Sequence, residues 1–247
     1  MKKISSSTTG FPTAGLLLAH AIGCSILFIT FRAALKFADV SGALAFYGVY
    51  HREPWNQFIH FFGVPGIIWS FMVFLVHLKV PILGNIPSIK KVLPEKHEFT
   101  YGVILAIFYL VFYLKIDPFG GVLYAPIVYL EYTSAVYLQQ KDQKEAGGKS
   151  WSGTGRLLTF AFILHAFSWY IQIHLGHHVI EGAQPASLQS LGGAITVAPL
   201  FAYYEFLWLI GVNSELQNET LRLVAKYTNE ICDAGKIYMR VCETLSS

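Results

Sequence analysis

The chain has 247 residues, of which 54% are hydrophobic and 13% charged, with a formal net charge of +3. Soluble domains carry about 25% charged residues, so this composition excludes a water-exposed globular protein and predicts a chain embedded in a lipid bilayer. The small net charge, without a basic run interleaved with aromatic residues, excludes a nucleic-acid partner. We therefore expect an all-α, polytopic bundle of about five to six transmembrane helices surrounded by membrane lipids.

Apolar runs divide the chain into candidate membrane helices. Six runs follow one another, at 11–31, 58–78, 99–114, 120–138, 157–173 and 188–212. A helix that crosses a bilayer needs about 20 apolar residues, with a range of about 17–25. The third run, with 16 residues, is therefore marginal, and the other five are long enough.

The two ends of the chain differ in composition from its middle. The first run continues to Phe31, which favours a membrane anchor over a cleaved signal peptide. The last 35 residues are polar and have an amphipathic pattern. We therefore divide the chain into an N-terminal anchor or extra helix (1–45), a membrane-embedded catalytic bundle (46–212) and a polar C-terminal tail (213–247).

Basic residues are distributed unevenly between the connecting segments. If the N-terminus is cytoplasmic and all six runs cross, fourteen of the 18 lysines and arginines lie on the cytoplasmic side, those of the C-terminal tail included. The remaining four, on the other side, are Arg32, Lys36, Arg52 and Lys115. Such a bias is the one that the positive-inside rule predicts.

The first histidine motif, Phe-Tyr-Gly-Val-Tyr-His-Arg-Glu-Pro-Trp-Asn-Gln-Phe-Ile-His, opens the second run and contains His51 and His60. These two histidines are nine residues apart, so they would lie on opposite faces of one unbroken helix. Pro54 removes this obstacle, because proline ends the helix before it and is tolerated in the first turn of the next. Asn56 lies at the start of this next helix, where it can cap the helix or hydrogen-bond a ring nitrogen.

The second histidine motif, Trp-Tyr-Ile-Gln-Ile-His-Leu-Gly-His-His-Val-Ile-Glu, closes the fifth run. His174 and His178 are four residues apart, as are His177 and Glu181, so each pair can supply neighbouring ligands on one helical face. Gly176 is a candidate break in this helix. The choice of histidines that face inward therefore stays open.

Four crossings separate the two motifs, so we expect both at the same membrane face. Ionisable groups near the membrane interior tend to mark function, and imidazole is the commonest metal ligand. The five clustered histidines are therefore candidate metal ligands. Glu205 is a candidate metal ligand, a partner for an imidazole N–H or a neutralised interior carboxyl group, of which we favour the partner role. We expect His20, His77 and His165 to be packed or hydrogen-bonded residues of the bundle. The three cysteines form no Cys-x-x-Cys pair and are read as ordinary thiols.

Taken together, these residues resemble the Mpo family of 2-hydroxy fatty acid dioxygenases of the endoplasmic reticulum membrane. The likeness runs from about Phe46 to Gly211 and is carried by Phe-Tyr-x-x-Tyr-His51, Asn56, Ile-His60, Val-Pro65, Trp-x-x-Gln172, Gly176-His177, Glu181, Pro185-Ala186, Ala198-Pro199 and Glu205. It implies an Fe(II)-dependent alpha-oxidation, in which a 2-hydroxy fatty acid from phytosphingosine breakdown is cleaved with dioxygen to an acid one carbon shorter.

The resemblance also assigns roles to particular residues. It implies that His51, His60 and His177 are catalytic and bind the metal, which leaves His174, His178 and Glu181 as further candidate ligands. The residues that we expect around the metal ligands, as hydrogen-bonding partners, are Asn56, Gln172 and Glu205. Where the family often has basic residues after the glutamate, this chain has Gly182-Ala183-Gln184.

Two other functions compete with this hypothesis. A non-enzymatic lipid-binding or transport protein of the membrane would bind no metal. A di-iron fatty acyl hydroxylase would hold two metals per chain, and His174-x-x-His177-His178 has the form of one of its histidine boxes. The sequence leaves the acyl chain length and the oligomeric state open.

Overall fold

The computed structural model describes residues 14–80, 98–148, 151–234 and Cys242. Within these ranges the regular elements are helices, and an isolated bridge joins the extended backbone at Lys79 and Thr100. The all-α prediction is therefore confirmed for the described part of the chain.

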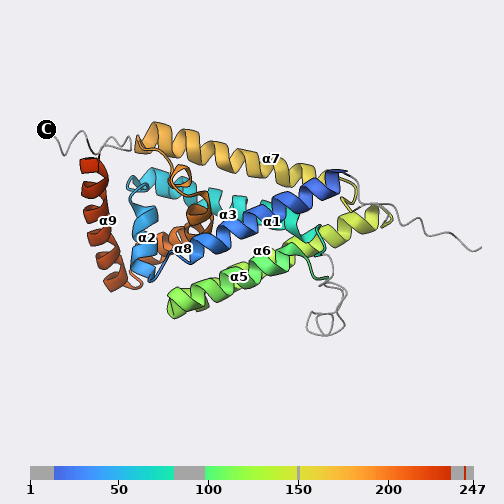
Figure 1. Ribbon diagram of the computed structural model, residues 1–247, viewed down its shortest axis with the longest axis horizontal. Coiled ribbons are helices and arrows are strands. Elements are labelled where there is room, and N and C mark those ends of the chain that lie inside the picture. The colour runs from blue at the N-terminus through green and yellow to red at the C-terminus, as the bar shows by residue number, and fades with distance from the viewer. Residues whose placement is uncertain (1–13, 81–97, 149–150, 235–241, 243–247) are drawn as a thin grey trace, which may run out of the picture.

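Long helices lie side by side, and short or transverse ones gather at one end of them (Figure 1). The elements are α1 (Ala14–Ala34), α2 (Val40–Gly48), α3 (Pro54–Val76), α5 (Tyr101–Ile116), α6 (Pro118–Glu145), α7 (Arg156–Tyr170), the π-helix η2 (Ile171–Glu181), the 3-10 helix η3 (Ala186–Leu188), α8 (Leu191–Leu209) and α9 (Ser214–Ala234). Helices α1, α3, α5, α6 and α7 run along the length of the molecule, whereas α2, α8 and α9 lie at one end.

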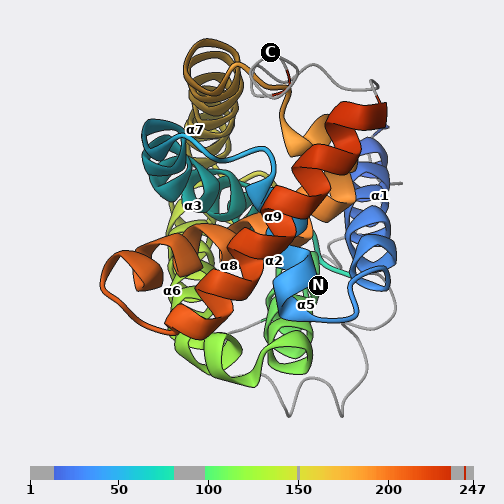
Figure 2. The same cartoon turned by 90° about the vertical axis from the view of Figure 1, so that its left-hand side faces the viewer.

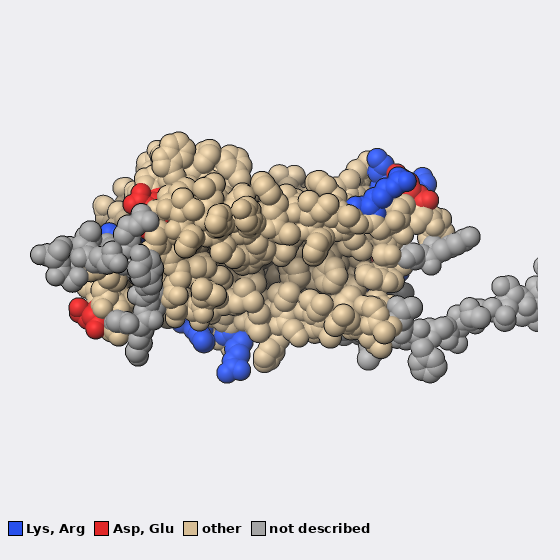
Figure 3. Space-filling model, turned by 90° about the horizontal axis from the view of Figure 1, so that it is seen from above, with Lys and Arg blue, Asp and Glu red and all other residues tan. Residues whose placement is uncertain are grey.

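Among the described residues, three segments are long and apolar enough to cross a membrane: α1, α3 and the continuous α7–η2 segment. Helix α5 is also apolar but has 16 residues. Charged side chains on the face shown in Figure 3 lie toward the two ends of the molecule and leave a broad band between them without charge. Both observations fit a membrane protein. The number of five to six crossings stays a prediction.

Helix α8 lies across the end of the bundle, although the sixth apolar run was expected to cross the membrane. Thr196 donates from Oγ1 to the carbonyl oxygen of Thr30 (3.2 Å), near the end of α1, and accepts from Tyr113, near the end of α5 (3.0 Å). Tyr203 donates to the carbonyl oxygen of Leu123 (3.3 Å), near the start of α6. All these partners lie at the same end of the long helices, so the stretch of α8 from Thr196 to Tyr203 is held there.

The amphipathic tail forms α9, which packs on α2 and lies across α2 and α8 when this end is viewed directly (Figure 2). Ser41 of α2 donates to Glu219 of α9 (3.2 Å). The tail therefore lies at the end of the molecule that holds the first histidine motif, and not at the opposite end, where the six-crossing topology placed it. Arg222 and Lys226 of α9 accordingly lie at the end of the molecule that holds the motifs.

The structure also tests what the sequence predicts for the cysteines and for three histidines outside the motifs. Cys232 at the end of α9 forms a disulfide with Cys242, so reading all three cysteines as thiols was wrong, and Cys24 is not disulfide-bonded. The three histidines expected to be bundle residues are indeed hydrogen-bonded there, through His20 with Tyr101, His77 with the Val73 carbonyl and His165 with Ser70.

The corner between α2 and α3 has the role that the sequence predicts for proline. Pro54 is the first residue of α3, and Glu53 before it is the N-cap with extended backbone (φ −82°, ψ 125°). Helix α2 ends earlier than expected, at Gly48. His51 therefore lies in a non-helical corner, while His60 lies in the second turn of α3.

Candidate metal centre

The side chains of His51, His60 and His177 meet at one point inside the protein. Their ring centroids are 4.3 Å (His51–His60), 4.7 Å (His51–His177) and 4.9 Å (His60–His177) apart. One nitrogen from each ring lies within 4.8 Å of the other two, and each residue is only 2% exposed. Histidines from both motifs thus come within reach of one cation.

Backbone carbonyl groups fix the orientation of two of these rings. His51 Nδ1 lies 2.8 Å from the carbonyl oxygen of Tyr47, and His60 Nδ1 lies 2.9 Å from that of Asn56. Because a carbonyl oxygen can only accept, each Nδ1 carries the proton and each Nε2 has a free lone pair. This arrangement of a metal-binding imidazole, with its second nitrogen held by an acceptor, is the usual one.

Two ring nitrogens in the cluster are left without a partner. His51 Nε2 and His177 Nδ1 are buried and make no hydrogen bond to the described residues. An unsatisfied buried polar group costs about 1–3 kcal/mol, so a bound cation would relieve both. Burial, together with the neighbouring His60 and His177, lowers the pKa of His51 well below its usual range. The His51 ring is therefore neutral, as a ligand must be, and three imidazoles leave coordination positions open.

The π-helix η2 determines which histidines of the second motif face the cluster. It continues α7 with hydrogen bonds that reach five residues along the chain. Gln172 and His177, five residues apart, are both buried. His174 and His178 lie on the exposed side and stack on one another, with ring centroids 6.0 Å apart. The structure does not bring these two candidate ligands into the cluster, because an α-helical spacing does not apply to this segment.

Two glycines allow η2 to approach α3 closely. A Cβ atom at Gly176 would lie 2.3 Å from Asn56 Oδ1 and 3.4 Å from His60 Cε1. A Cβ atom at Gly63 would lie 2.5 Å from Gln172 Nε2. The sequence had suggested that Gly176 breaks the helix, and this is wrong because η2 continues through it. Gly176 instead makes room for the residues that support the histidines.

Glu181, expected as a further candidate ligand, instead holds the corner before α3. Its Oε1 accepts from the backbone N–H of Arg52 (2.9 Å), and its Oε2 accepts from the backbone N–H of Glu53 (3.0 Å). Asn56 Nδ2 also donates to Oε2 (3.0 Å). A carboxylate is stabilised by free N–H groups at a helix N-terminus, so Glu181 joins the two histidine motifs without being a ligand itself.

The two other expected supporting residues make different contacts. Gln172 donates from Nε2 to the Ser168 carbonyl oxygen (2.8 Å) rather than to an imidazole. Both carboxyl oxygens of Glu205 are buried and make no hydrogen bond to the described residues, so the predicted bond from an imidazole is not present. Burial, and secondarily Glu181, raises the pKa of Glu205 well above its usual range. Its neutral carboxyl group is directed into a cavity.

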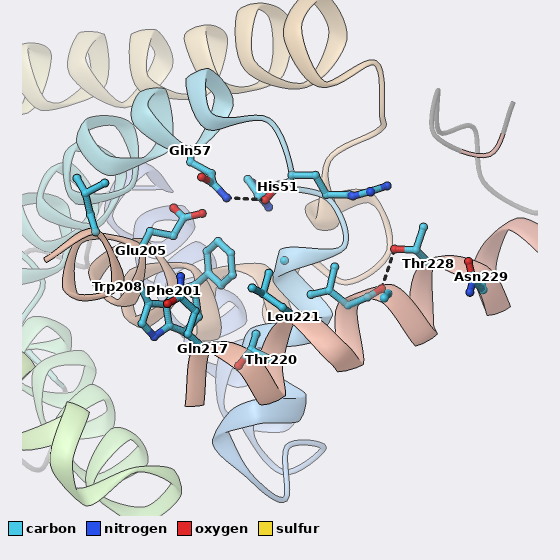
Figure 4. A pocket seen from close by; sticks show the side chains of 15 residues that line it. His51, Gln57, Phe201, Glu205, Trp208, Gln217, Thr220, Leu221, Thr228 and Asn229 are labelled. Carbon is cyan, nitrogen blue, oxygen red and sulfur yellow. Dashed lines mark hydrogen bonds between the residues drawn. The ribbon is translucent and has the colours of Figure 1, made fainter. Parts of the chain in front are cut away.

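A cavity of about 790 Å³ separates the α2–α3 corner from α9 (Figure 4). We call it the chamber. Gln57 and Glu205 line it on one side, together with His51, and Leu221 and Thr228 of α9 line it on the other. A volume of about 300–1,000 Å³ is typical of small-molecule sites. Sequence reasoning missed the contribution of α9, for which the amphipathic pattern of the tail was the available signal.

A much smaller cavity lies on the other side of the histidine cluster. Its volume is about 40 Å³, and it touches His60 and His177. The rest of its lining is mostly apolar and includes Val64, Ile67 and Ala198. The cluster is thus flanked by a large chamber, which is lined by both polar and apolar side chains, and by a small apolar cavity.

The chain is similar to known proteins over the part that holds the histidine cluster. A family profile described as "2-hydroxy-palmitic acid dioxygenase Mpo1-like" matches residues 37–209. The chain belongs to the Mpo1-like family. Within this family, the 2-hydroxy-palmitic acid dioxygenase MPO1 of Saccharomyces cerevisiae is 27% identical over 179 residues, which cover 72% of this chain and 86% of the relative. No solved structure matches the chain. The Mpo1-like match includes the three clustered histidines and ends before α9.

Proposed function

We propose that this chain is a metal-dependent dioxygenase that carries out alpha-oxidation of 2-hydroxy fatty acids. The observation that carries the proposal is the cluster of His51, His60 and His177, in which two buried ring nitrogens have no other partner. The activity printed for the yeast relative supports the same reaction class. We propose iron(II) as the metal, because imidazole ligands with open coordination positions suit non-haem oxygenases.

The proposed reaction balances with one dioxygen per turnover. The bond between C1 and C2 of the 2-hydroxy acid breaks, C2 is oxidised from an alcohol to a carboxyl group, and C1 leaves as carbon dioxide. Dioxygen is reduced, and one of its atoms or the hydroxyl oxygen leaves as water. The product is the fatty acid one carbon shorter. We place this step in the breakdown of phytosphingosine, at the endoplasmic reticulum membrane.

The metal would supply a Lewis acid for the hydroxyl and carboxylate groups and a redox partner for dioxygen. The chain's own residues hold the ligands in place: the Tyr47 and Asn56 carbonyl groups orient two rings, and Glu181 holds the corner that carries His51. The chamber beside His51 suits the polar head of the acid. The small apolar cavity at His60 suits a molecule of the size and polarity of dioxygen.

The placement of the second motif favours one metal over two. His174 and His178 lie on the exposed side of η2, away from the cluster. A di-iron hydroxylase would require further ligands near the first three, and the described residues offer no other group of histidines, cysteines or acids at metal-binding distances. This arrangement supports the mononuclear hypothesis.

The test uses the full chain purified in detergent and supplied with Fe(II), dioxygen and 2-hydroxypalmitate. We expect pentadecanoate, and we expect a chelator to abolish its formation. His60→Ala should be inactive, whereas His178→Ala, which removes an exposed histidine of the second motif, should retain activity. A folded, iron-loaded protein that yields no pentadecanoate would overturn the proposal.

A further inference from the structure

A second cavity, of about 380 Å³, lies between the start of α3 and the end of α8. We call it the groove. Its lining is almost entirely apolar and consists of Pro54, Trp55, Gln57, Phe58, Phe61, Glu205, Phe206 and Leu209. The two exceptions, Gln57 and Glu205, are the polar residues that line the chamber as well.

The groove adjoins the chamber through shared residues. Gln57, Glu205 and Leu209 line both cavities. Gln57 also donates from Nε2 to the His51 carbonyl oxygen (3.0 Å), which ties this junction to the histidine cluster. A molecule that extends from His51 past Gln57 therefore passes from a cavity with several polar side chains into one that is almost entirely apolar.

The groove is open to the outside of the bundle. Trp55 is 69% exposed, Phe58 55% and Leu209 85%, although all three are large apolar side chains. Two of them belong to α3, one of the segments that can cross a membrane. Exposed apolar surface of this kind is favourable in contact with lipid, so a hydrocarbon chain can enter the groove from the side.

The charge of Arg52 and the sizes of the cavities indicate where each end of such a molecule can bind. Arg52 is the one lysine or arginine among the residues that line the chamber, the groove and the small cavity, and it lies in the chamber. Arginine suits a carboxylate because its planar fork donates two hydrogen bonds. The small cavity at His60 and His177, about 40 Å³, is far smaller than the groove, about 380 Å³. The groove is therefore the better match for a long alkyl chain.

We propose that a single-chain amphiphile with an anionic head, which is the 2-hydroxy fatty acid if the proposed function holds, binds across the two larger cavities. Its head occupies the chamber next to His51 and Arg52, and its alkyl chain lies in the groove between α3 and α8. This binding mode assigns the groove a ligand class and gives the exposed aromatic residues at the start of α3 a role in holding the chain.

Tryptophans report on each cavity separately. Trp55 lines the groove, Trp208 lines the chamber and Trp169 lines the small cavity, whereas Trp69 lies elsewhere and donates to Ser134. The probe is 2-hydroxypalmitate brominated in the middle of its chain, added to the metal-loaded protein without dioxygen. We expect it to quench tryptophan fluorescence, and unbrominated 2-hydroxypalmitate to displace it. Most of the displaceable quenching should be lost in Trp55→Phe and kept in Trp69→Phe.

Controls separate this proposal from its alternatives. The brominated methyl ester, which has no carboxylate, measures simple partition into detergent and should show little displaceable quenching. Displaceable quenching that is kept in Trp55→Phe and lost in Trp169→Phe would overturn the groove assignment, as would its absence from the unaltered protein. Because no turnover is needed, a protein that binds through Trp55 but makes no pentadecanoate would overturn the proposed reaction and leave the groove assigned.

Discussion

Glu181 accepts a hydrogen bond at 3.0 Å from the backbone N–H of Glu53, a residue 128 positions earlier in the chain. This contact joins the last residue of η2 to the cap of α3, so the two helices that carry His177 and His60 are fixed to one another at their ends. The position of each histidine therefore depends on a carboxylate that lies outside the group of three clustered imidazoles.

Replacing Glu181 should weaken metal binding while every histidine remains. Without the carboxylate, the N–H groups of Arg52 and Glu53 lose their acceptors, and the corner that holds His51 loosens. Loss of such a supporting partner typically lowers metal affinity about 10–100-fold, and we expect this for Glu181→Ala, with Glu181→Gln intermediate. Metal titration of the purified protein measures it, and equal affinity in Glu181→Ala and the unaltered protein would contradict the positioning role.

A methyl group at Gly176 should separate η2 from α3. The new Cβ atom would lie 2.3 Å from Asn56 Oδ1, so the helices must move apart, and overpacking of this kind costs about 1–3 kcal/mol of unfolding free energy. We expect Gly176→Ala to lower both the unfolding temperature and metal affinity. Gly15→Ala is the control, because nothing lies within 4 Å of its added Cβ atom. Equal stability of the two variants would show that η2 and α3 do not pack closely at Gly176.

The metal content should be one ion per chain. His51→Ala removes a buried member of the cluster and should abolish retention of the metal through gel filtration. The double variant His174→Ala/His178→Ala, which changes only exposed histidines of η2, should keep the ion. Elemental analysis distinguishes the outcomes, and two metals per chain, or loss of metal in the double variant, would instead support a dinuclear site.

Arg52 should contribute to recognition of the substrate's carboxylate. Arg52→Gln keeps the backbone N–H that Glu181 binds but removes the cation from the chamber. Because the side chain is exposed and screened by water, we expect a rise in KM of about two- to fivefold, with little change in kcat. Steady-state kinetics with 2-hydroxypalmitate measure this, and Arg156→Gln, at the far end of the bundle, is the matched control. An equal effect of the two variants would argue against a carboxylate contact.

The conformational preferences of single residues were sufficient to predict the corner in the first histidine motif. Proline in the first turn of a helix, and its incompatibility with the helix before it, required a corner between His51 and His60, and the structure has one at Pro54. Composition and run length likewise predicted an all-α chain with apolar segments. These features depend on residues close together in the sequence.

Features that depend on tertiary packing could not be predicted from the sequence in this way. An apolar run has the same appearance whether its helix crosses a bilayer or is buried inside a protein, so the transverse placement of α8 could not be read from 188–212. The π-helix was missed because an α-helical period was assumed, which grouped His174 with His178. Glu205 was predicted to accept a hydrogen bond from an imidazole. The fold instead directs its carboxyl group into the chamber, whose other wall is α9, a helix outside the part of the chain that resembles the family.

The wider turns of η2 let two residues five apart, Gln172 and His177, share one buried face. In an ordinary α-helix, at about 100° per residue, the same spacing would turn His177 about 140° away from Gln172. The histidine cluster therefore depends on the π-helical backbone as well as on the histidines themselves. Deleting one residue between Gln172 and His177 would leave them four apart, a spacing that an ordinary α-helix places on one face.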